Sequence, residues 1–177
     1  MGWTEIENAL QSEIANGAAI EGSRVRWEIQ SHDTPQGIAD YATLRIEALT
    51  PIASETPEQV VTDNPAAVPG GEILIESREH SEFDLQVTIY SVRSTGARSA
   101  IAIANQARAS LGTESSAVRL STAGLAIVRT TTVQRVPALL ETEFEDRAVF
   151  TARVRFCDGY SEPSTFIESA EWSATFN

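Results

Sequence analysis

The sequence predicts an α+β fold: a mainly antiparallel sheet with two helices packed on one face and a long Pro-rich loop projecting from the sheet. Three observations support this class. Several segments alternate apolar and polar residues with the period of a strand, whereas two others repeat apolar residues every three to four positions, as helices do. Four prolines and a Gly-Gly pair then interrupt this order across residues 50–71.

Residues 4–16 form the first predicted helix. Thr4 and Glu7 have the spacing of a capping box, and Gly17 is suited to end the helix in a left-handed conformation. The buried stripe is expected to consist of Ile6, Leu10 and Ile14.

Two strands are predicted next, over residues 20–29 and 40–49. The first has Val25 and Trp27 on one parity, and the second alternates clearly through its whole length. Residues 31–37, which include His32, predict a turn between them.

Residues 50–71 leave little room for regular structure because they contain Pro57, Pro65 and Pro69. A loop of this length within a compact domain favours a functional role, such as reaching a partner, although an ordinary variable hairpin tip is the equal alternative. Strand patterns resume at residues 72–78 and 82–92, with His80 expected at a hairpin tip between them.

The second helix is predicted over residues 97–111, with a stripe of small apolar residues and Gly112 just past its end. A short helical turn over residues 116–121 and a β-branched strand over residues 125–133 follow.

The segment 136–170 is the most informative part of the chain. An acidic run leads into a strand over residues 147–156, in which Ala148, Phe150, Ala152, Val154 and Phe156 share one parity. Cys157 precedes Asp158-Gly159, a dipeptide typical of turns, so the strand is expected to end there and a last strand to span residues 164–174.

Composition favours one domain over residues 1–177, with 42% hydrophobic and 21% charged residues. The net charge of -12 argues against a surface that binds nucleic acid by neutralising phosphates. All thirteen basic residues are arginine, which excludes Schiff-base and P-loop lysine chemistry. The N-terminus lacks the pattern of a signal peptide, and no apolar run is long enough to span a membrane.

Catalytic and metal-binding patterns are missing from the sequence, so we expect no catalytic residues, no cofactor and no metal site. The two histidines lie in predicted loops, and Cys157 is the single cysteine. The acidic run of Glu141, Glu143, Glu145 and Asp146 is the one candidate for acid/base chemistry or a hard cation. Without the glycine spacing of a calcium loop, a solvated edge or a salt-bridged rim is the better interpretation.

Nearly the whole chain resembles the neck or tail terminator proteins of tailed bacteriophages. The resemblance rests on TEIENALQSEIA, DYATLRIEALTPI, EFDLQVTIYSV followed by a helix, and LLETEFEDRAVFTARVRFCDGYSEPSTFIESAEW. It implies a non-enzymatic structural protein of the virion neck, assembled in the host cytoplasm. It further implies a homohexameric ring that packs between the tail tube protein and a head-completion or connector protein, with phage DNA passing through the lumen.

For such a ring, the carboxylates are expected to line the lumen so that DNA slides without sticking. The 50–71 loop, with Pro57, Pro65 and Pro69, is the first candidate for reaching a neighbour. Arg147, Arg153 and Arg155 are the second, through pairing with the acidic run at 141–146 of the next subunit; pairing within one subunit is equally plausible. A ligand-binding or other assembly module, or a carboxylate-dependent hydrolase, remains the alternative.

Overall fold

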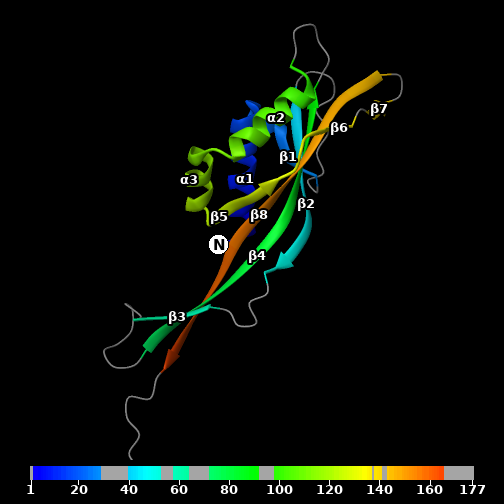
Figure 1. The fold of residues 1–177 in the computed structure, drawn as a ribbon. Helices are drawn as coiled ribbons and strands as arrows, with labels where there is room; N and C mark the ends of the chain where they lie inside the picture. The colour runs from blue at the N-terminus through cyan, green and yellow to red at the C-terminus, as the bar shows by residue number, and fades with distance from the viewer. Residues whose placement is uncertain are drawn as a thin grey trace, which may run out of the picture.

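A computed structural model describes residues 2–28, 40–52, 58–63, 72–91, 98–136, 138–140 and 143–165. Its sheet has the strand order β1-β2-β4-β8-β5, with β3 paired to β4 and with β6 and β7 paired to β8 (Figure 1). All the described pairings are antiparallel except β1 with β2. The predicted α+β class with a mainly antiparallel sheet is therefore confirmed.

Helix α1, Trp3–Ala18, begins and ends differently from the prediction. Thr4 lies inside the helix, so the expected capping box with Glu7 is wrong; instead the backbone N–H of Gly2 donates to Glu5 Oε2 at 3.1 Å. Ala19, with a φ of 53°, follows the helix in the left-handed conformation that was expected of Gly17. Gly17 is buried within the helix and lies against α2.

The first predicted strand is shorter than expected. A 3-10 turn, η1 (Gly22–Arg24), precedes β1, Val25–Trp27, because Gln11 Nε2 donates to the backbone oxygens of Gly22 and Val25 and holds this segment against α1. Strand β2, Tyr41–Pro51, confirms the second prediction. The predicted turn with His32 lies outside the described residues.

Strands β4, Glu72–Ser91, and β8, Glu143–Thr165, form one antiparallel ladder of 20 residue pairs, from Glu72↔Thr165 to Ser91↔Asp146. Two predicted breaks are therefore wrong. His80 lies within β4 opposite Cys157, and Asp158-Gly159 continues β8 instead of turning. The two predicted breaks lie opposite each other in the ladder, so each residue of either segment has a paired residue on the other strand. This pairing favours extended backbone over the turns that the local sequence prefers.

Strand β3, Glu58–Asp63, pairs with residues 73–78 of β4. Part of the predicted 50–71 loop is thus a strand, which corrects the expectation of irregular structure there. Pro57, Pro65 and Pro69 lie outside the described residues. Of the last predicted strand, residues 164–165 end β8 and the remainder lies outside the described residues.

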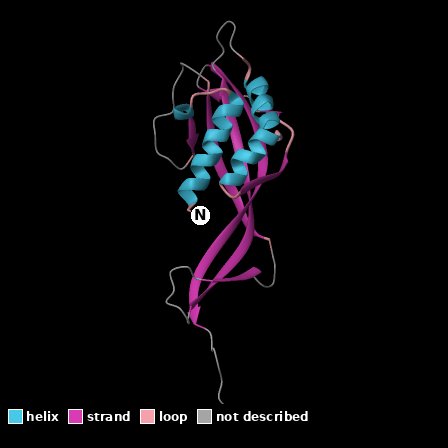
Figure 2. Cartoon of the chain, turned by 90° about the vertical axis from the view of Figure 1, so that its left-hand side faces the viewer, coloured by secondary structure: helices cyan, strands magenta, loops and turns pink. Residues whose placement is uncertain are grey.

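Three described helices, rather than two, cover one face of the sheet (Figure 2). Helix α2, Ala100–Leu111, is capped by Ser99, and α3, Glu114–Thr122, extends the predicted helical turn and is capped by Thr113. The remaining strands are β5 (Leu125–Thr130), β6 (Gln134–Arg135) and β7 (Ala138–Leu140).

The core lies between the helices and the sheet face that they cover, here called the inner face. The parity predicted for residues 147–156 is confirmed, because Ala148, Phe150, Ala152 and Val154 are each at most 1% exposed. From β4 and the helices, the main partners are Leu85, Val87, Ile89, Leu10, Ile14 and Ile103.

Beyond the helices, the strands continue as an arm (Figures 1 and 2). The arm comprises β3, residues 72–79 of β4 and residues 158–165 of β8. In both views the arm extends away from the helix-covered body, and none of the described helices packs against it.

Candidate protein interface

The sheet face opposite the helices, here called the outer face, has no covering layer among the described elements (Figure 2). Register places polar residues there in cross-strand pairs: Glu82↔Arg155, Asp84↔Arg153, Gln86↔Thr151 and Tyr90↔Arg147. Alternation causes this, since their sequence neighbours Phe83, Leu85 and Ala152 face the core. The outer face is therefore a polar surface that is suited to contact another molecule.

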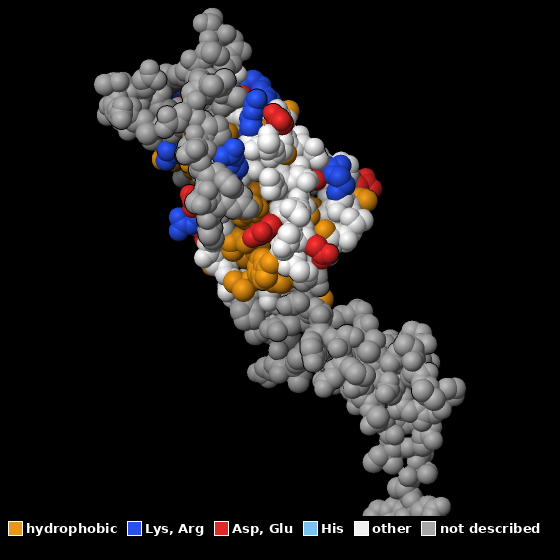
Figure 3. Space-filling model, turned by 180° about the vertical axis from the view of Figure 1, so that it is seen from behind, with side chains coloured by type: hydrophobic (Ala, Val, Ile, Leu, Met, Phe, Trp, Pro, Cys, Tyr) orange, Lys and Arg blue, Asp and Glu red, His pale blue; other side chains and the backbone are white. Residues whose placement is uncertain are grey.

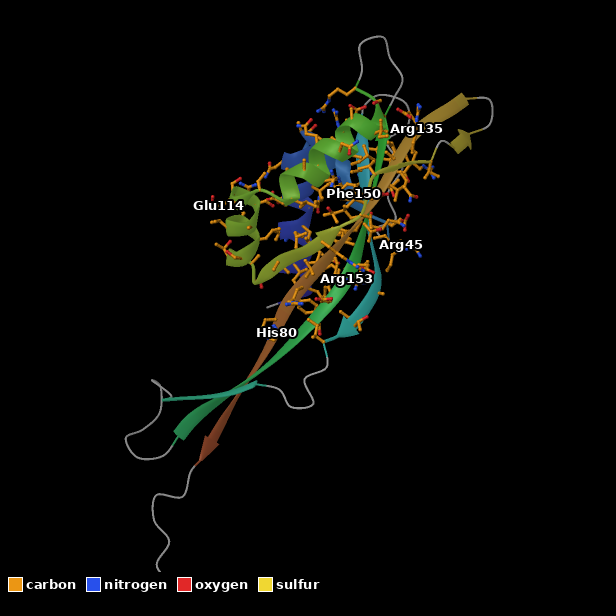
Figure 4. All side chains as sticks on the ribbon, in the orientation of Figure 1. Arg45, His80, Glu114, Arg135, Phe150 and Arg153 are labelled. Atoms are coloured by element: carbon orange, nitrogen blue, oxygen red, sulfur yellow. The ribbon has the colours of Figure 1, made fainter. Side chains whose placement is uncertain are left out.

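Arg153 and Asp84 form an ion pair with two hydrogen bonds on this face (Figure 4 labels Arg153). Arg153 Nε donates to Asp84 Oδ1 at 2.8 Å, and Nη2 donates to Oδ2 at 2.9 Å. The hydrogen bonds from Arg153 lower the pKa of Asp84 below its ordinary value, although partial burial acts in the opposite direction. A two-point contact of this kind fixes the guanidinium in the plane of the carboxylate.

Arg155 is paired one step along the ladder. Its Nε and Nη2 both donate to Glu82 Oε1, at 3.0 and 2.7 Å. Arg153 and Arg155, two of the predicted interface arginines, are thus paired within the chain, with Asp84 and Glu82. Contact of these arginines with a neighbouring subunit stays a prediction.

Arg129 adds a positive charge directly beside the first pair. It lies opposite Arg153 in the pairing of β5 with β8, and its charge also lowers the pKa of Asp84, after the larger effects of Arg153. Arg129 is exposed, and it has no hydrogen bond or ion pair with the part of the chain that the structure describes. Like charges directly opposite each other in a sheet are destabilising.

At the other end of the outer face, an arginine lies over stacked aromatic rings. The rings of Tyr41 and Tyr90 are parallel, with centroids 4.3 Å apart, and the guanidinium carbon of Arg147 lies 4.8 Å from the Tyr90 ring centroid. This arrangement combines aromatic stacking with a cation–π contact. The third predicted interface arginine therefore also has a partner within the chain.

Asp146 has a different environment from that predicted for the acidic run. Its side chain is buried on the inner face, where Oδ2 accepts from the backbone N–H of Ala100 at 3.0 Å and Oδ1 accepts from Arg135 Nε at 2.9 Å. A contact of this carboxylate with another subunit would first require these bonds to break.

The rest of the predicted interface is less fully described. Glu143 and Glu145 belong to β8 and pair through their backbones with Leu140 and Ala138 of β7. Glu141, like the three prolines of the 50–71 segment, lies outside the described residues.

Sequence reasoning missed Glu82, Asp84 and Arg129 as parts of this surface. The alternation of residues 82–92 places Glu82 and Asp84 on the polar parity of a strand. The register that brings them against Arg155 and Arg153 joins positions about 70 residues apart, and no local pattern specifies it.

The charges of the described outer face are mixed, with an excess of arginine. Arg45, for example, lies across the sheet from Glu114 of α3 (Figure 4) and forms a loose pair with Glu28 at 3.6 Å. By register and contacts, the arginines are Arg26, Arg45, Arg129, Arg147, Arg153 and Arg155, and the carboxylates are Glu28, Glu47, Glu82 and Asp84. This face is therefore positive in a chain whose net charge is -12.

An apolar surface lies near the junction of the body and the arm. Trp3 is 44% exposed and packs against Phe83 and Phe156, while Leu49, 54% exposed, is paired with Phe83 in the sheet. Figure 3 shows hydrophobic side chains gathered on one area of the described surface. Such exposure of large apolar side chains is a second feature typical of interaction surfaces.

Within the described ranges, no three His, Cys, Asp or Glu side chains are grouped so as to hold a metal ion. The helices described here are too short or too polar to cross a membrane.

A family model described as phage neck terminator protein matches residues 4–177. No curated protein matches the chain.

Proposed function

The chain belongs to the phage neck terminator protein family, and from this premise we propose that it ends the tail tube and joins it to the head as a homohexameric ring through which DNA passes. A structural role in the phage neck follows from the family itself. The ring, its partners and the passage of DNA are the proposed part.

The match over residues 4–177 carries this proposal, since it includes the helices, the sheet and the arm together. The outer face, which the described helices leave open, supports it, because a subunit that packs against neighbours needs a surface that its own helices do not cover. A heterologous contact between two different surfaces closes into a ring when the rotation between subunits permits it.

The proposed partners are other copies of this chain, the tail tube protein below the ring and a head-completion or connector protein above it. The proposed role is structural and non-enzymatic, within the virion neck, after assembly in the host cytoplasm. Contacts with neighbours are expected from the 50–71 segment and from the arginines of β8.

An intersubunit role for Arg153 and Arg155 has to coexist with their bonds to Asp84 and Glu82. A guanidinium offers five N–H donors, so an arginine that binds one carboxylate retains donors for a second. Glu141, Glu143 and Glu145 of a neighbour remain the predicted second acceptors for these arginines.

The net charge of -12 supports the passage of DNA without tight binding. We propose that carboxylates face the lumen, since negative charge repels phosphates and gives no counterion release on contact. Arginines lining the lumen in an assembled ring would contradict this part of the proposal.

Assembly tests the proposal directly. The purified protein, alone and mixed with its tail tubes, is examined by light scattering and negative-stain imaging, and we expect sixfold rings, free or capping the tube ends. A phage that lacks the gene should produce separate heads and tails in the lysate, with joining restored by the gene supplied in trans. Normal virions without the gene would overturn the proposal.

A further inference from the structure

We propose that the arm of one subunit docks on the outer face of a second copy of this chain, with acidic residues of the arm meeting Arg129 and the adjacent arginines. This inference rests on the proposed ring and names the two surfaces that would form its repeating contact.

The arm carries a large share of the negative charge of the chain. Residues 58–63 contain two carboxylates, residues 72–79 contain three and residues 158–165 contain two, whereas Arg78 is the one basic residue of the three segments. A segment with this excess of negative charge is complementary to a positively charged surface of a partner.

The outer face provides a matching positive site. Arg129 and Arg153 lie directly opposite each other on β5 and β8. Arg153 is paired with Asp84, and the positive charge of Arg129 acts on the same carboxylate. With Arg155, three guanidinium groups lie near two carboxylates on this part of the sheet, Asp84 and Glu82. A carboxylate from outside, placed near Arg129, would balance the site.

The two surfaces cannot meet within one subunit. Strands β4 and β8 run unbroken from the outer face into the arm, paired through all 20 positions. Folding the arm back onto its own outer face would break this ladder. A contact between an arm and an outer face would therefore join two molecules, and it would be heterologous, as a closed ring requires.

Its length suits that role. The eight residues 72–79 of β4 extend roughly 26 Å at about 3.3 Å per residue, beyond the edge of the helix-covered body. An arm of this size can cross much of the outer face of a neighbour.

A second copy is a better occupant than a nucleic acid. A DNA duplex approaching the outer face would also meet the remaining negative charge of the chain, including the arm itself. An arm from an identical subunit brings its negative charge to the positive face and leaves its own body outside the contact.

Charge reversal tests the contact. Arg129→Glu alters an exposed side chain that has no ion pair among the described residues, so the fold should persist, as thermal unfolding will verify. The double substitution Glu72→Arg and Glu76→Arg reverses two charges of the arm. The control is Arg24→Glu, which reverses one positive charge on the turn before β1.

Association is measured by mass photometry and light scattering at low salt, with tail tubes present if rings form only on them. We expect Arg129→Glu and the arm variant each to weaken association by about tenfold or more, and their combination in one chain to restore it within about threefold. Arg24→Glu should match the wild type, and about 0.5 M salt should weaken the wild-type contact.

The outcomes separate this inference from the proposed function. If both charge-reversed variants form rings as well as the wild type does, the proposed arm contact is wrong and the proposed ring still holds. Failure of the wild type to form rings under every condition, tubes included, overturns both. Normal rings together with loss of duplex DNA binding in Arg129→Glu would assign the face to nucleic acid and overturn the arm contact.

Discussion

Asp146, near the start of β8, holds the first turn of helix α2 by accepting a hydrogen bond from the backbone N–H of Ala100 at 3.0 Å. The same carboxylate accepts from Arg135 of β6 at 2.9 Å and is 3% exposed. A negative group at a helix N-terminus satisfies an otherwise unpaired N–H and interacts favourably with the helix dipole. One side chain therefore joins the longest strand, an edge strand and the second helix.

Replacing Asp146 with alanine is expected to destabilise the fold by roughly 2–3 kcal/mol, because it leaves the N–H of Ala100 without its acceptor and removes the partner of Arg135. Chemical denaturation monitored by circular dichroism measures this loss. Asp146→Asn keeps the side-chain oxygen and should lose less than the alanine variant. Equal losses for both variants would show that the negative charge, rather than the acceptor, holds the helix.

The sequence alone was enough to predict the residues of β8 that face the core. Ala148, Phe150, Ala152 and Val154 alternate so regularly with polar residues that the period of a strand is unambiguous. The role of Asp146 could not be predicted in this way, because its partner Ala100 is 46 residues distant and the pairing depends on how α2 packs. Local patterns specify faces, whereas partners depend on register.

Turn signals failed for a related reason. Asp158-Gly159 and the polar residues around His80 favour turns locally, yet they lie opposite each other in the ladder of β4 with β8. Pairing along 20 positions outweighs a weak local preference. These two turn patterns predicted separate short strands. The arm, and the contact proposed for it between subunits, could therefore not be predicted from the sequence.

The ion pair of Glu13 with Arg119 should make stability depend on pH. Arg119 Nε and Nη2 donate to the two oxygens of the buried Glu13, at 2.8 and 2.7 Å, and lower the pKa of Glu13 below its ordinary value of 4.5. A lowered pKa in the folded state stabilises the protein above the unfolded-state pKa, and this contribution is lost as the pH falls through the folded-state pKa.

We therefore expect Glu13→Gln to be clearly less stable than the wild type at pH 7, and the difference to shrink as the pH falls below about 4.5 and through the folded-state pKa, as about 1.4 kcal/mol accompanies each unit of pKa difference. Urea denaturation at a series of pH values measures the difference. Glu114→Gln, at an exposed site on α3, is the control and should leave the pH dependence unchanged. A gap between wild type and Glu13→Gln that stays constant with pH would contradict the prediction.

On the outer face, Asp84→Ala is expected to cost more stability than Arg153→Ala. Removing Asp84 leaves Arg129 and Arg153 opposite each other without the carboxylate beside them, whereas removing Arg153 leaves Asp84 beside Arg129. The difference should be about 0.5–1 kcal/mol at low salt and smaller at high salt, since these side chains are partly exposed.

A third variant isolates the cause of that asymmetry. Adding Arg129→Ala to Asp84→Ala should recover part of the lost stability, because it removes one of the two opposed charges. Denaturation of the single and double variants as a mutant cycle measures this coupling. If Arg129→Ala recovered no stability in the Asp84→Ala background, Arg129 and Arg153 would not repel each other across the strands.

Gly17 allows α1 to approach α2 closely. A Cβ at this position would lie 3.3 Å from Ala107 Cα and 3.1 Å from Ser110 Cβ, and would collide with Ser110 Oγ. Alanine in a helix interior is more stable than glycine by about 1 kcal/mol, but forcing two packed helices apart typically costs about 1–3 kcal/mol. Since one of the contacts is with backbone, we expect the packing cost to exceed the gain.

Gly17→Ala should therefore lower the denaturation midpoint, and Ser110→Gly in the same chain should restore part of it by removing the nearest side chain. Gly112→Ala is the matched control, because a Cβ there would meet Ala109 O at an ordinary 3.5 Å and the φ of -87° suits alanine. We expect that variant to be as stable as the wild type or slightly more so. If Gly17→Ala were also as stable as the wild type, α1 and α2 would have room to separate, and glycine would not be required for their contact.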